Sequence, residues 1–520
     1  MNNIDSLIKT AKKLRIHSLK MTTKAKSGHP TTCLSSADLI TCLFFHEMKY
    51  NIEDPNDWGN DEFVLSKGHA APLLWAAYAE AGIIPVQKLM SLRKINSPLE
   101  GHPTPRMKWV KAATGSLGQG LSVGVGIAAA IKLGKSPART FVLLGDGECA
   151  EGSVWEAANA ACFFGLDNLC AVIDINRLGQ SDQTMHQHDL KAYERKFKAF
   201  GWNTVAIDGH SFKEIISAFD QAAQSDKPTA ILAKTLKGKG VSFLENKNGW
   251  HGKPLNQNEL QAALEEIGPI PEIDCSKLVK KPKHSKKPNY SNSYNFKRND
   301  YKAGTATRRA YGNALLQLAR VNDRVVVLDG DVKNSTYVEE FFNAYPERAF
   351  QNFIAEQNML GMGIGMAVKG YLPFMATFAA FLTRAHDQIR MAAYSFSNIK
   401  IAGSHVGVSI GADGPSQMGL EDLALFRSIP GCAVLYPCDA YSTEACVEII
   451  SRYKGMAYLR ASRPATPLLY DKSERFKLGG SKILRKSNKD AAVVIAAGVT
   501  VFEALKACLL YTSDAADEED

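Results

Sequence analysis

Two short segments place oxygen-bearing side chains directly after apolar, strand-like runs. Residues 141–144 (FVLL) lead into residues 145–148 (GDGE), and residues 174–176 (DIN) follow the next apolar run. A glycine turn that opens a helix offers backbone N–H groups to a phosphate. Asp146 in this turn would repel a bare diphosphate, whereas Mg²⁺ or Ca²⁺ would bridge the carboxylate to the phosphates through hard oxygen ligands. The two segments therefore predict a site for a metal-bound diphosphate.

The same turn also fits a dinucleotide-binding fingerprint, because residues 145–150 (GDGECA) match GxGxxG/A after a strand. Asp146 stands between the two glycines, where a metal-free pyrophosphate would meet its negative charge. The acidic residue that the fingerprint expects about 20 positions later has no clean candidate, since Asp167 lies in a turn-like stretch and Asp174 lies further on. A nicotinamide oxidoreductase, or a glycine turn that only joins a strand to a helix, remains open on these residues.

The elements that must position these residues alternate along the chain. Strand-like runs at 140–144, 169–173 and 229–233 alternate with alanine-rich helical stretches at 155–163 and 212–223, which predicts a parallel α/β sheet with helices on both faces. The pattern starts again with a helix at 307–319, a strand at 325–328, a helix at 357–368 and strands at 374–376 and 399–404. A third start comes at 491–497 (AAVVIAA), before a helix that begins near Phe502.

Length and composition indicate a multidomain globular protein. A chain of 520 residues is expected to form about three domains of ~150 residues each. No apolar run approaches the ~20 residues that span a bilayer, and the N-terminal 20 residues fit an amphipathic helix rather than a secretory signal. The ten cysteines lack any metal-ligand spacing, so we expect free thiols in a reducing cytosol.

The net charge of +9 is concentrated in one short stretch. Residues 276–289 (SKLVKKPKHSKKPN) hold six lysines, and their prolines and lack of periodicity predict an exposed linker. A polyanion-binding patch is the alternative, but aromatic-rich nucleic-acid motifs are absent elsewhere, so we expect no nucleic-acid partner. Residues 508–520 (CLLYTSDAADEED) form an acidic tail that we expect to be non-native and not to continue the preceding helix.

Beyond the predicted metal–diphosphate turn, longer motifs resemble those of the transketolases, a family of thiamine-diphosphate enzymes, in their animal-type form. The resemblance covers residues 1 to about 507. It rests on strings in family order, including SGHPTTC (27–33), FVLSKGHAAP (63–72), EGHPTP (100–105), ATGSLGQGL (113–121), LLGDGECAEGSVWEA (143–157), DINRLGQSD (174–182), WHGKP (250–254), IAEQNM (354–359), TFAAFLTRA (377–385) and GSHVGVSIGADGPSQM (403–418).

The resemblance implies consecutive doubly wound parallel-sheet domains of the thiamine-diphosphate-binding type. Their expected bounds are a diphosphate-binding domain at 1–274, a Lys/Pro-rich linker at 275–303, a pyrimidine-binding domain at 304–470, and the start of a truncated C-terminal domain at 471–507. The residues matched to the metal are Asp146, Asn176 and the backbone carbonyl of Leu178. Those matched to the coenzyme are Thr32, His69, Gly115, Ser116, Leu117, Gly147, Glu151, Lys237, His251, Phe381 and Gln417; animal relatives usually carry serine where this chain has Thr32.

Glu356 matches the family's catalytic glutamate. A carboxyl group held against N1′ of the aminopyrimidine favours the imino tautomer of the coenzyme, whose nitrogen then takes the thiazolium proton. Glu356 is expected between an apolar strand at 353–355 and a glycine-rich helix. The plainer alternative is a glutamate at a helix N-terminus, favoured by the helix dipole.

Five histidines lie in Gly/Ser/Pro-rich loops, which suggests a polar cleft that handles hydroxyl groups and protons. They are His29, His69, His102, His251 and His405. By resemblance, His29, His102 and His251 are catalytic and face the reacting hydroxyls of the sugar, Asp413 orients a neighbouring hydroxyl, and Gln180 lies near the substrate. Arg308, Ser335, His405 and Arg463 match the family's ligands for the sugar phosphate, and arginine forks suit that role.

The resemblance implies a transferase that moves a two-carbon ketol unit from xylulose 5-phosphate to ribose 5-phosphate or erythrose 4-phosphate, in the non-oxidative pentose phosphate pathway. It also implies thiamine diphosphate with Mg²⁺ or Ca²⁺, a homodimer with active sites at the subunit interface, and a cytoplasmic location without membrane partners. A deoxyxylulose-phosphate synthase that decarboxylates pyruvate, and a non-catalytic relative, remain alternatives; WHGKP and the GSH…GADGPSQM string favour the transketolase.

Overall fold

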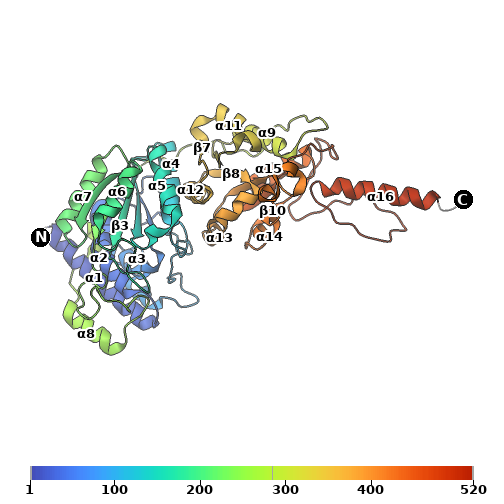
Figure 1. Cartoon of the computed structure of the whole chain (residues 1–520). Coiled ribbons are helices and arrows are strands. Elements are labelled where there is room, and N and C mark those ends of the chain that lie inside the picture. The colour runs from blue at the N-terminus through green and yellow to red at the C-terminus, as the bar shows by residue number, and fades with distance from the viewer. Residues whose placement is uncertain (1–2, 284, 518–520) are drawn as a thin grey trace. The chain divides into compact units, whose positions relative to one another are not determined.

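The computed structural model describes residues 3–283 and 285–517. Contacts divide the chain into two compact units: the first unit comprises residues 1–288 with 364–369, and the second unit comprises residues 289–363 with 370–520 (Figure 1). Each unit holds one parallel β-sheet. Over the part of the chain that the structure describes, no helix is long and apolar enough to cross a membrane.

The sheet of the first unit has the strand order β1-β2-β3-β5-β4, and every pair is parallel. The strands are β1 (Glu62–Leu65), β2 (Thr140–Gly145), β3 (Leu169–Ile175), β4 (Asn203–Asp208) and β5 (Thr229–Lys234). Strands β1, β2 and β3 are buried along their whole length, as expected for a parallel sheet covered on both faces. The edge strand β4 is only partly buried, and its weaker apolar pattern explains why the sequence did not predict it.

Helices cover both faces of this sheet. On one face, α1 (Asn3–Ala25), α2 (Pro30–Cys42), α3 (Ala71–Glu80) and α7 (Phe212–Gln224) share a core with Phe141 and Leu143. Because side chains alternate along a strand, Val142 points to the other face, where it meets Gly124 of α4 (Gly120–Leu133). The remaining helices are α5 (Gly152–Phe163), which packs on α4, α6 (Leu190–Ala199), which packs on β4 and β5, and α8 (Gln257–Ile267), which packs on α1.

The parallel arrangement brings the loops after all five strands to one edge of the sheet. The chain leaves β1 at Ser66, β2 at Asp146, β3 at Asn176, β4 at Gly209 and β5 at Thr235. In doubly wound folds ligands bind at the carboxyl ends of the strands. The predicted metal ligands are therefore placed at the edge where a ligand is expected.

The sheet of the second unit has the order β10-β11-β9-β8-β6-β7 and is also parallel throughout. Its strands are β6 (Val325–Asp329), β7 (Ala349–Gln351), β8 (Leu372–Phe378), β9 (Lys400–Ser404), β10 (Ala433–Leu435) and β11 (Ala457–Arg460). Its helices are α9 (Thr307–Ala319), α10 (Lys333–Thr336), α11 (Glu339–Ala344), α13 (His386–Tyr394), α14 (Asp422–Arg427), α15 (Ala440–Arg452) and α16 (Thr500–Asp517). Helix α12 (Glu356–Val368) begins in this unit, and its residues from 364 onward are assigned to the first unit. Helices α9 and α15 pack together over a core that includes Leu315, Phe374 and Val447.

Three local expectations are wrong. Residues 353–355 form no strand, because Phe353 has φ +56° and Ile354 is 70 % exposed. Residues 491–497 also form no strand; Val493, Val494 and Ile495 are exposed, with no neighbouring strand to pair with among the described residues. Residues 508–517 do continue the preceding helix, since α16 spans Thr500–Asp517; residues 518–520 of the predicted tail lie outside the described residues.

The start of the predicted linker contacts the first unit. Cys275 is buried beside Thr10, with 3.3 Å between Oγ1 and Sγ. The amide of Tyr50 donates to the carbonyl of Lys280 at 2.9 Å, which forms an isolated parallel bridge. The side chains of Lys277, Lys280, Lys281 and Lys283 are exposed, so the charged side chains lie at the surface while neighbouring atoms contact the first unit.

Candidate active site

The predicted metal-binding loops meet at the ends of β2 and β3. Strand pairing sets Gly145 beside Asp174, so Asp146 and Asn176 follow on neighbouring strands. Both side chains are buried. One carboxylate oxygen of Asp146 accepts from the backbone N–H of Arg177 and from the hydroxyl of Thr184, each at 2.8 Å. Burial raises the pKa of Asp146 to about 6. A cation bound nearby would lower this pKa, because it stabilises the charged carboxylate.

The Leu178 carbonyl already meets a positive charge. The ammonium group of Lys237 donates to the carbonyl oxygens of Leu178 at 2.7 Å and Gly179 at 3.1 Å, and lies 2.8 Å from Nδ1 of His251. Burial, with the charge of Lys67, lowers the pKa of Lys237 to about 8. A carboxylate, an amide and a backbone carbonyl are the oxygen donors that Mg²⁺ or Ca²⁺ prefers, so these residues fit the predicted metal. Among the described residues no cluster of three or more His, Cys, Asp or Glu side chains could hold a metal.

A buried glutamate that sequence reasoning missed holds the glycine turn. Glu148 accepts from the backbone N–H groups of Gly118 at 2.8 Å and Gly145 at 3.0 Å, and from the hydroxyl of Ser66. Burial raises its pKa above the usual range. Gly118 (φ +83°) ends the loop of Gly115. Glu148 therefore joins the two glycine loops predicted to contact the coenzyme.

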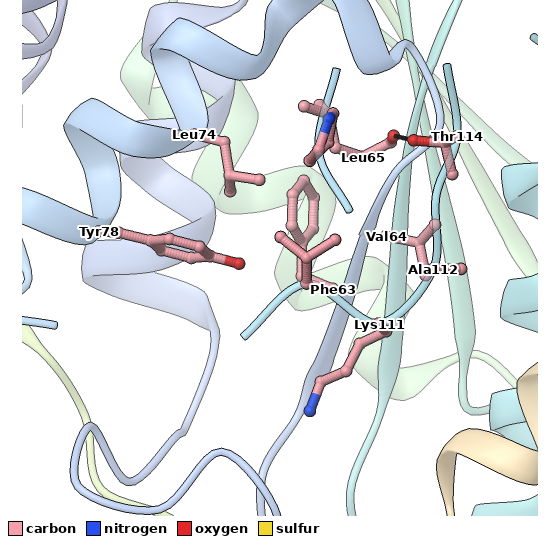
Figure 2. A pocket seen from close by; sticks show the side chains of 10 residues that line it. Phe63, Val64, Leu65, Leu74, Tyr78, Lys111, Ala112 and Thr114 are labelled. Carbon is pink, nitrogen blue, oxygen red and sulfur yellow. Dashed lines mark hydrogen bonds between the residues drawn. The ribbon is translucent and has the colours of Figure 1, made fainter. Parts of the chain in front are cut away.

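The loop that carries Gly115 is also tied to strand β1. The hydroxyl of Thr114 donates to the carbonyl of Leu65 at 2.6 Å, as the dashed line in Figure 2 shows. Phe63, Leu74 and Tyr78 line a small cavity beside this bond (Figure 2). Its volume of about 10 Å³ is too small for a coenzyme. The hydrogen bond from Thr114 to Leu65 therefore supports the loop, and the cavity beside it is not a coenzyme-binding pocket.

Four of the five predicted histidines cluster in the first unit. The ring of His29 lies 5.3 Å from His69, 6.0 Å from His102 and 5.0 Å from His251, between centroids. Nε2 of His69 lies 3.3 Å from the hydroxyl of Thr32. Nδ1 of His29 is buried and lacks a hydrogen-bond partner among the described residues. Such an orphaned polar atom fits a site whose remaining partner is a ligand.

These histidines are held in their neutral form. Burial, with the charges of His102 and Arg93, lowers the pKa of His29 to about 4. Burial, with the charge of Lys237, lowers that of His251 to about 3, and the pKa values of His69 and His102 are lowered by burial too. At neutral pH each ring therefore offers both a donor and an acceptor nitrogen.

Arg93 is a further cation at this cluster that the sequence did not single out. Its Nη1 donates to the hydroxyl of Ser27 at 2.9 Å, and its guanidinium packs over the backbone of Gly101, next to His102. Its backbone is left-handed, with φ +59°. The run of 91–97 (SLRKINS) is ordinary in composition, so no local signal marked it.

The second unit gathers the residues predicted to bind the sugar phosphate. Nη1 of Arg308 donates to the carbonyl of Ser335 at 2.7 Å and lies 3.5 Å from Nε2 of His405. Burial, with the charge of Arg308, lowers the pKa of His405 to about 4. The ring of His405 stacks on Phe378 at 3.8 Å, and Phe378 stacks on Phe381 at 5.3 Å.

The other predicted residues of the second unit differ in their exposure. Arg463 donates to the carbonyl of Ile410 at 2.7 Å and lies 3.4 Å from a carboxylate oxygen of Asp413. Gln417 is half-buried in the 3-10 turn Pro415–Gln417. Glu356 is the first residue of α12 and is 4 % exposed. The predicted site residues thus form two groups, one in each unit.

Comparisons with known proteins agree with this division. Residues 6–276 match the family model "Transketolase, thiamine diphosphate binding domain", and residues 303–467 match "Transketolase, pyrimidine binding domain". The chain is 49 % identical to the Homo sapiens transketolase over 518 residues, which cover 98 % of this chain and 82 % of that protein. It is also 49 % identical to the Mus musculus transketolase over 511 residues, covering 97 % and 81 %.

A solved structure of the transketolase from Campylobacter jejuni superposes with a TM-score of 0.83 at 27 % identity, covering 90 % of this chain and 80 % of that one. These matches define the class as thiamine-diphosphate-dependent enzymes with doubly wound domains. The chain belongs to the transketolase family. The family, fold class and coenzyme predicted from the motifs are confirmed.

Proposed function

We propose that this chain transfers a two-carbon ketol unit from a ketose phosphate such as xylulose 5-phosphate to an aldose phosphate such as ribose 5-phosphate or erythrose 4-phosphate. This is the transketolase reaction of the non-oxidative pentose phosphate pathway. One observation carries the proposal. The loops after β2 and β3, which hold the predicted oxygen ligands, and a cluster of four neutral histidines occur together in one unit. The family match over residues 6–276 supports it.

In the first unit we assign the cation to Asp146, Asn176 and the carbonyl of Leu178. When bound, thiamine diphosphate supplies a nucleophilic carbon, which cleavage of the bond between C2 and C3 of a ketose requires. Lys237 and His69 are assigned to the diphosphate and thiazolium. Further contacts to the coenzyme are assigned to Thr32, Gly115, Ser116, Leu117, Gly147 and Glu151. We place this half of the site in a domain at residues 1–274.

In the second unit, a domain at residues 304–470, we assign Glu356, Phe381 and Gln417 to the pyrimidine half. Glu356 is buried at the start of a helix, where it can hold a proton against a ring nitrogen. Phe353 and Ile354 precede it and are 44 % and 70 % exposed. Exposed apolar side chains beside a buried functional group support a partner surface. We therefore propose a homodimer with two active sites at the subunit interface, Glu151 facing the opposite subunit's catalytic glutamate.

The histidines would handle the hydroxyl groups of the sugar. Because their pKa values are low, His29, His102 and His251 are neutral and can accept or return a proton at a ring nitrogen. Asp413 would orient a neighbouring hydroxyl group, and Gln180 would lie near the substrate.

The sugar phosphate would be held in the second unit. Arg308 and Arg463 provide two guanidinium groups, with Ser335 and His405 beside Arg308. Paired arginines hold a phosphate through several charge-assisted hydrogen bonds. All ten cysteines are free thiols, which supports the proposal of a cytoplasmic, reducing location.

The test is turnover by the purified protein. With thiamine diphosphate and Mg²⁺, xylulose 5-phosphate and ribose 5-phosphate should give a seven-carbon ketose phosphate and a three-carbon aldose phosphate. Omitting the coenzyme should abolish the reaction. Turnover of pyruvate without turnover of xylulose 5-phosphate would contradict the proposal.

A further inference from the structure

A fully buried aspartate at the end of β3 connects the loops of the first unit. Asp174 is 0 % exposed and accepts hydrogen bonds from five side chains. The donors are Ser35 at 2.7 Å, Ser36 at 2.8 Å, Asn176 at 3.1 Å, Lys67 and Thr235. These six residues, Ser35, Ser36, Lys67, Asp174, Asn176 and Thr235, are called the Asp174 cluster.

Asn176 is itself assigned to the metal, and each of the other donors lies within four residues of a residue assigned to the coenzyme. Ser35 and Ser36 follow Thr32 by one turn of α2. Lys67 precedes His69 in the loop after β1, and Thr235 precedes Lys237 in the loop after β5. One carboxylate therefore links four separate segments of the proposed site.

The bond to Asn176 fixes the direction of its amide. Its Nδ2 donates to Asp174, while its Oδ1 accepts from the backbone N–H of Leu178 at 3.2 Å. A turned amide would present N–H donors, which repel a cation, in place of an oxygen ligand. The carboxylate of Asp174, which can only accept, and the backbone N–H of Leu178, which can only donate, together hold Asn176 in the orientation that a cation needs.

The segment that carries Lys237 is fixed at successive residues. The hydroxyl of Thr235 donates to Asp174, and the backbone N–H of Leu236 donates to Nε2 of His210 at 2.9 Å. The backbone N–H of Gly238 donates to the carbonyl of Thr31 at 2.9 Å. Asp174 thus anchors this segment to β3, the strand that leads into the predicted metal-binding loop.

Lys67 offsets the free-energy cost of burying the charged carboxylate of Asp174. Its ammonium is paired with Asp174 and donates to the hydroxyl of Ser36 at 3.1 Å, and its side chain is 1 % exposed. An isolated buried charge is costly, whereas a paired and hydrogen-bonded one persists. Neither residue has an exposed surface on which a ligand could lie.

We propose that Asp174, whose charge is balanced by Lys67, is a positioning residue. It orients the amide of Asn176 towards the metal, and it holds in place the segment around Lys237 that is assigned to the diphosphate. This inference rests on the proposed function, because it concerns the coenzyme site assigned there. Residues that orient metal ligands typically change metal affinity by about 10–100-fold when they are replaced.

The test compares Mg²⁺ dependence in matched variants. Asp174→Asn and the charge-balanced double variant Lys67→Met/Asp174→Asn are titrated with Mg²⁺ at saturating thiamine diphosphate, with coenzyme binding followed by calorimetry and by thermal unfolding. The control is Glu80→Gln, which removes a different buried carboxylate of the first unit, paired with Lys13 at 2.6 Å and His17 at 2.7 Å. Thr235→Val is the milder variant, because it removes one donor of the cluster and keeps the ion pair.

We expect both Asp174 variants to raise the half-saturating Mg²⁺ concentration by about tenfold or more, and to shrink the rise in Tm on coenzyme binding. Glu80→Gln should lower the Tm of the free and the loaded protein alike and leave the Mg²⁺ dependence unchanged. Thr235→Val should weaken coenzyme binding several-fold.

Unchanged Mg²⁺ dependence in a folded Asp174 variant would overturn the inference. If neither Asp174 variant folds, Thr235→Val decides, and coenzyme binding equal to that of the unaltered protein overturns it. Failure of the unaltered protein to bind thiamine diphosphate with Mg²⁺ would instead contradict the proposed function itself and with it the basis of the inference.

Discussion

Glu356 is the residue whose assigned role is most specific. Its carboxyl is buried at the first turn of α12, where the positive end of the helix dipole and a ring nitrogen could both act on it. Glu356→Gln keeps the shape and removes the proton exchange. We expect kcat to fall by about 10²–10⁴-fold, with coenzyme affinity changed only a few-fold, as measured by steady-state kinetics and calorimetry. A large loss of affinity with kcat retained would contradict the role.

The low pKa values of His29 and His405, each about 4, predict a pH dependence of stability. A histidine with a pKa below its unfolded value of about 6.5 takes up its proton only on unfolding, between these two values. Stability should therefore fall as the pH drops from about 6.5 towards 4, by up to about 3 kcal/mol for each such histidine, because each unit of pKa difference corresponds to about 1.4 kcal/mol.

The measurement for this prediction is the guanidinium midpoint of the coenzyme-free protein at pH 7.5, 6 and 5. His405→Gln removes one titrating ring and should flatten the decline. A midpoint that rises on acidification, or an equal decline in the variant, would show that these rings are not held neutral.

At the residue scale, the sequence motifs predicted side chains that carry chemistry but not those that support them. Asp146 and Asn176 were visible because each follows an apolar run and has a chemistry of its own. Glu148 and Lys67 were not, since their partners lie far along the chain: Gly118 for Glu148 and Asp174 for Lys67. Such roles arise only when the sheet brings distant segments together.

Helix α9 illustrates a prediction at the scale of an element. A Cβ on Gly312 would lie 1.9 Å from the carbonyl oxygen of Tyr337, so the helix packs directly on the backbone that follows Ser335. Arg308 lies one turn earlier on the same helix, and its guanidinium lies 5.1 Å from the centre of the Tyr337 ring. Overpacking here should displace the segment that the phosphate site uses.

We expect Gly312→Ala to lower the free energy of unfolding by about 1–3 kcal/mol and to raise the KM for phosphorylated sugars more than it lowers kcat. Denaturant unfolding and kinetics with both substrates measure these effects. Gly152→Ala is the matched control, because a Cβ there meets nothing within 4 Å. Equal effects of the two substitutions would mean that the close approach at Gly312 is unimportant.

Long buried elements were predictable, and short or unpartnered ones were not. The apolar runs at β2, β3 and β5 and the helix α9 are found where their patterns predict them. Strands β10 and β7 have three residues each, too few for an alternation to be recognised. Residues 491–497 have a strand-like composition but find no strand beside them among the described residues, because pairing and not propensity makes a strand.

For the whole molecule, the proposed dimer makes a prediction at Ile354. This side chain is 70 % exposed and lies two residues before Glu356. Ile354→Asp would place a charge in an apolar interface, which is costly without a partner. We expect the dimer dissociation constant to rise about tenfold or more, which corresponds to a loss of at least about 1.4 kcal/mol.

Analytical ultracentrifugation over a range of concentrations measures that change, and activity should fall in parallel at low protein concentration. Ile483→Asp is the control, because Ile483 is 77 % exposed in a segment without a regular element. A monomeric unaltered protein with full turnover would contradict interface-shared sites.

The central claim is that a cation on the loops after β2 and β3 holds the coenzyme. The most direct measurement is thermal unfolding of the unaltered protein, Asp146→Ala and Glu356→Ala, each with and without thiamine diphosphate and Mg²⁺. Ligand bound only to the folded state at about 100 times its Kd adds about 2.7 kcal/mol, so we predict a clear rise in Tm for the unaltered protein and for Glu356→Ala. Asp146→Ala should show no rise. An equal rise in Asp146→Ala and Glu356→Ala would contradict the account.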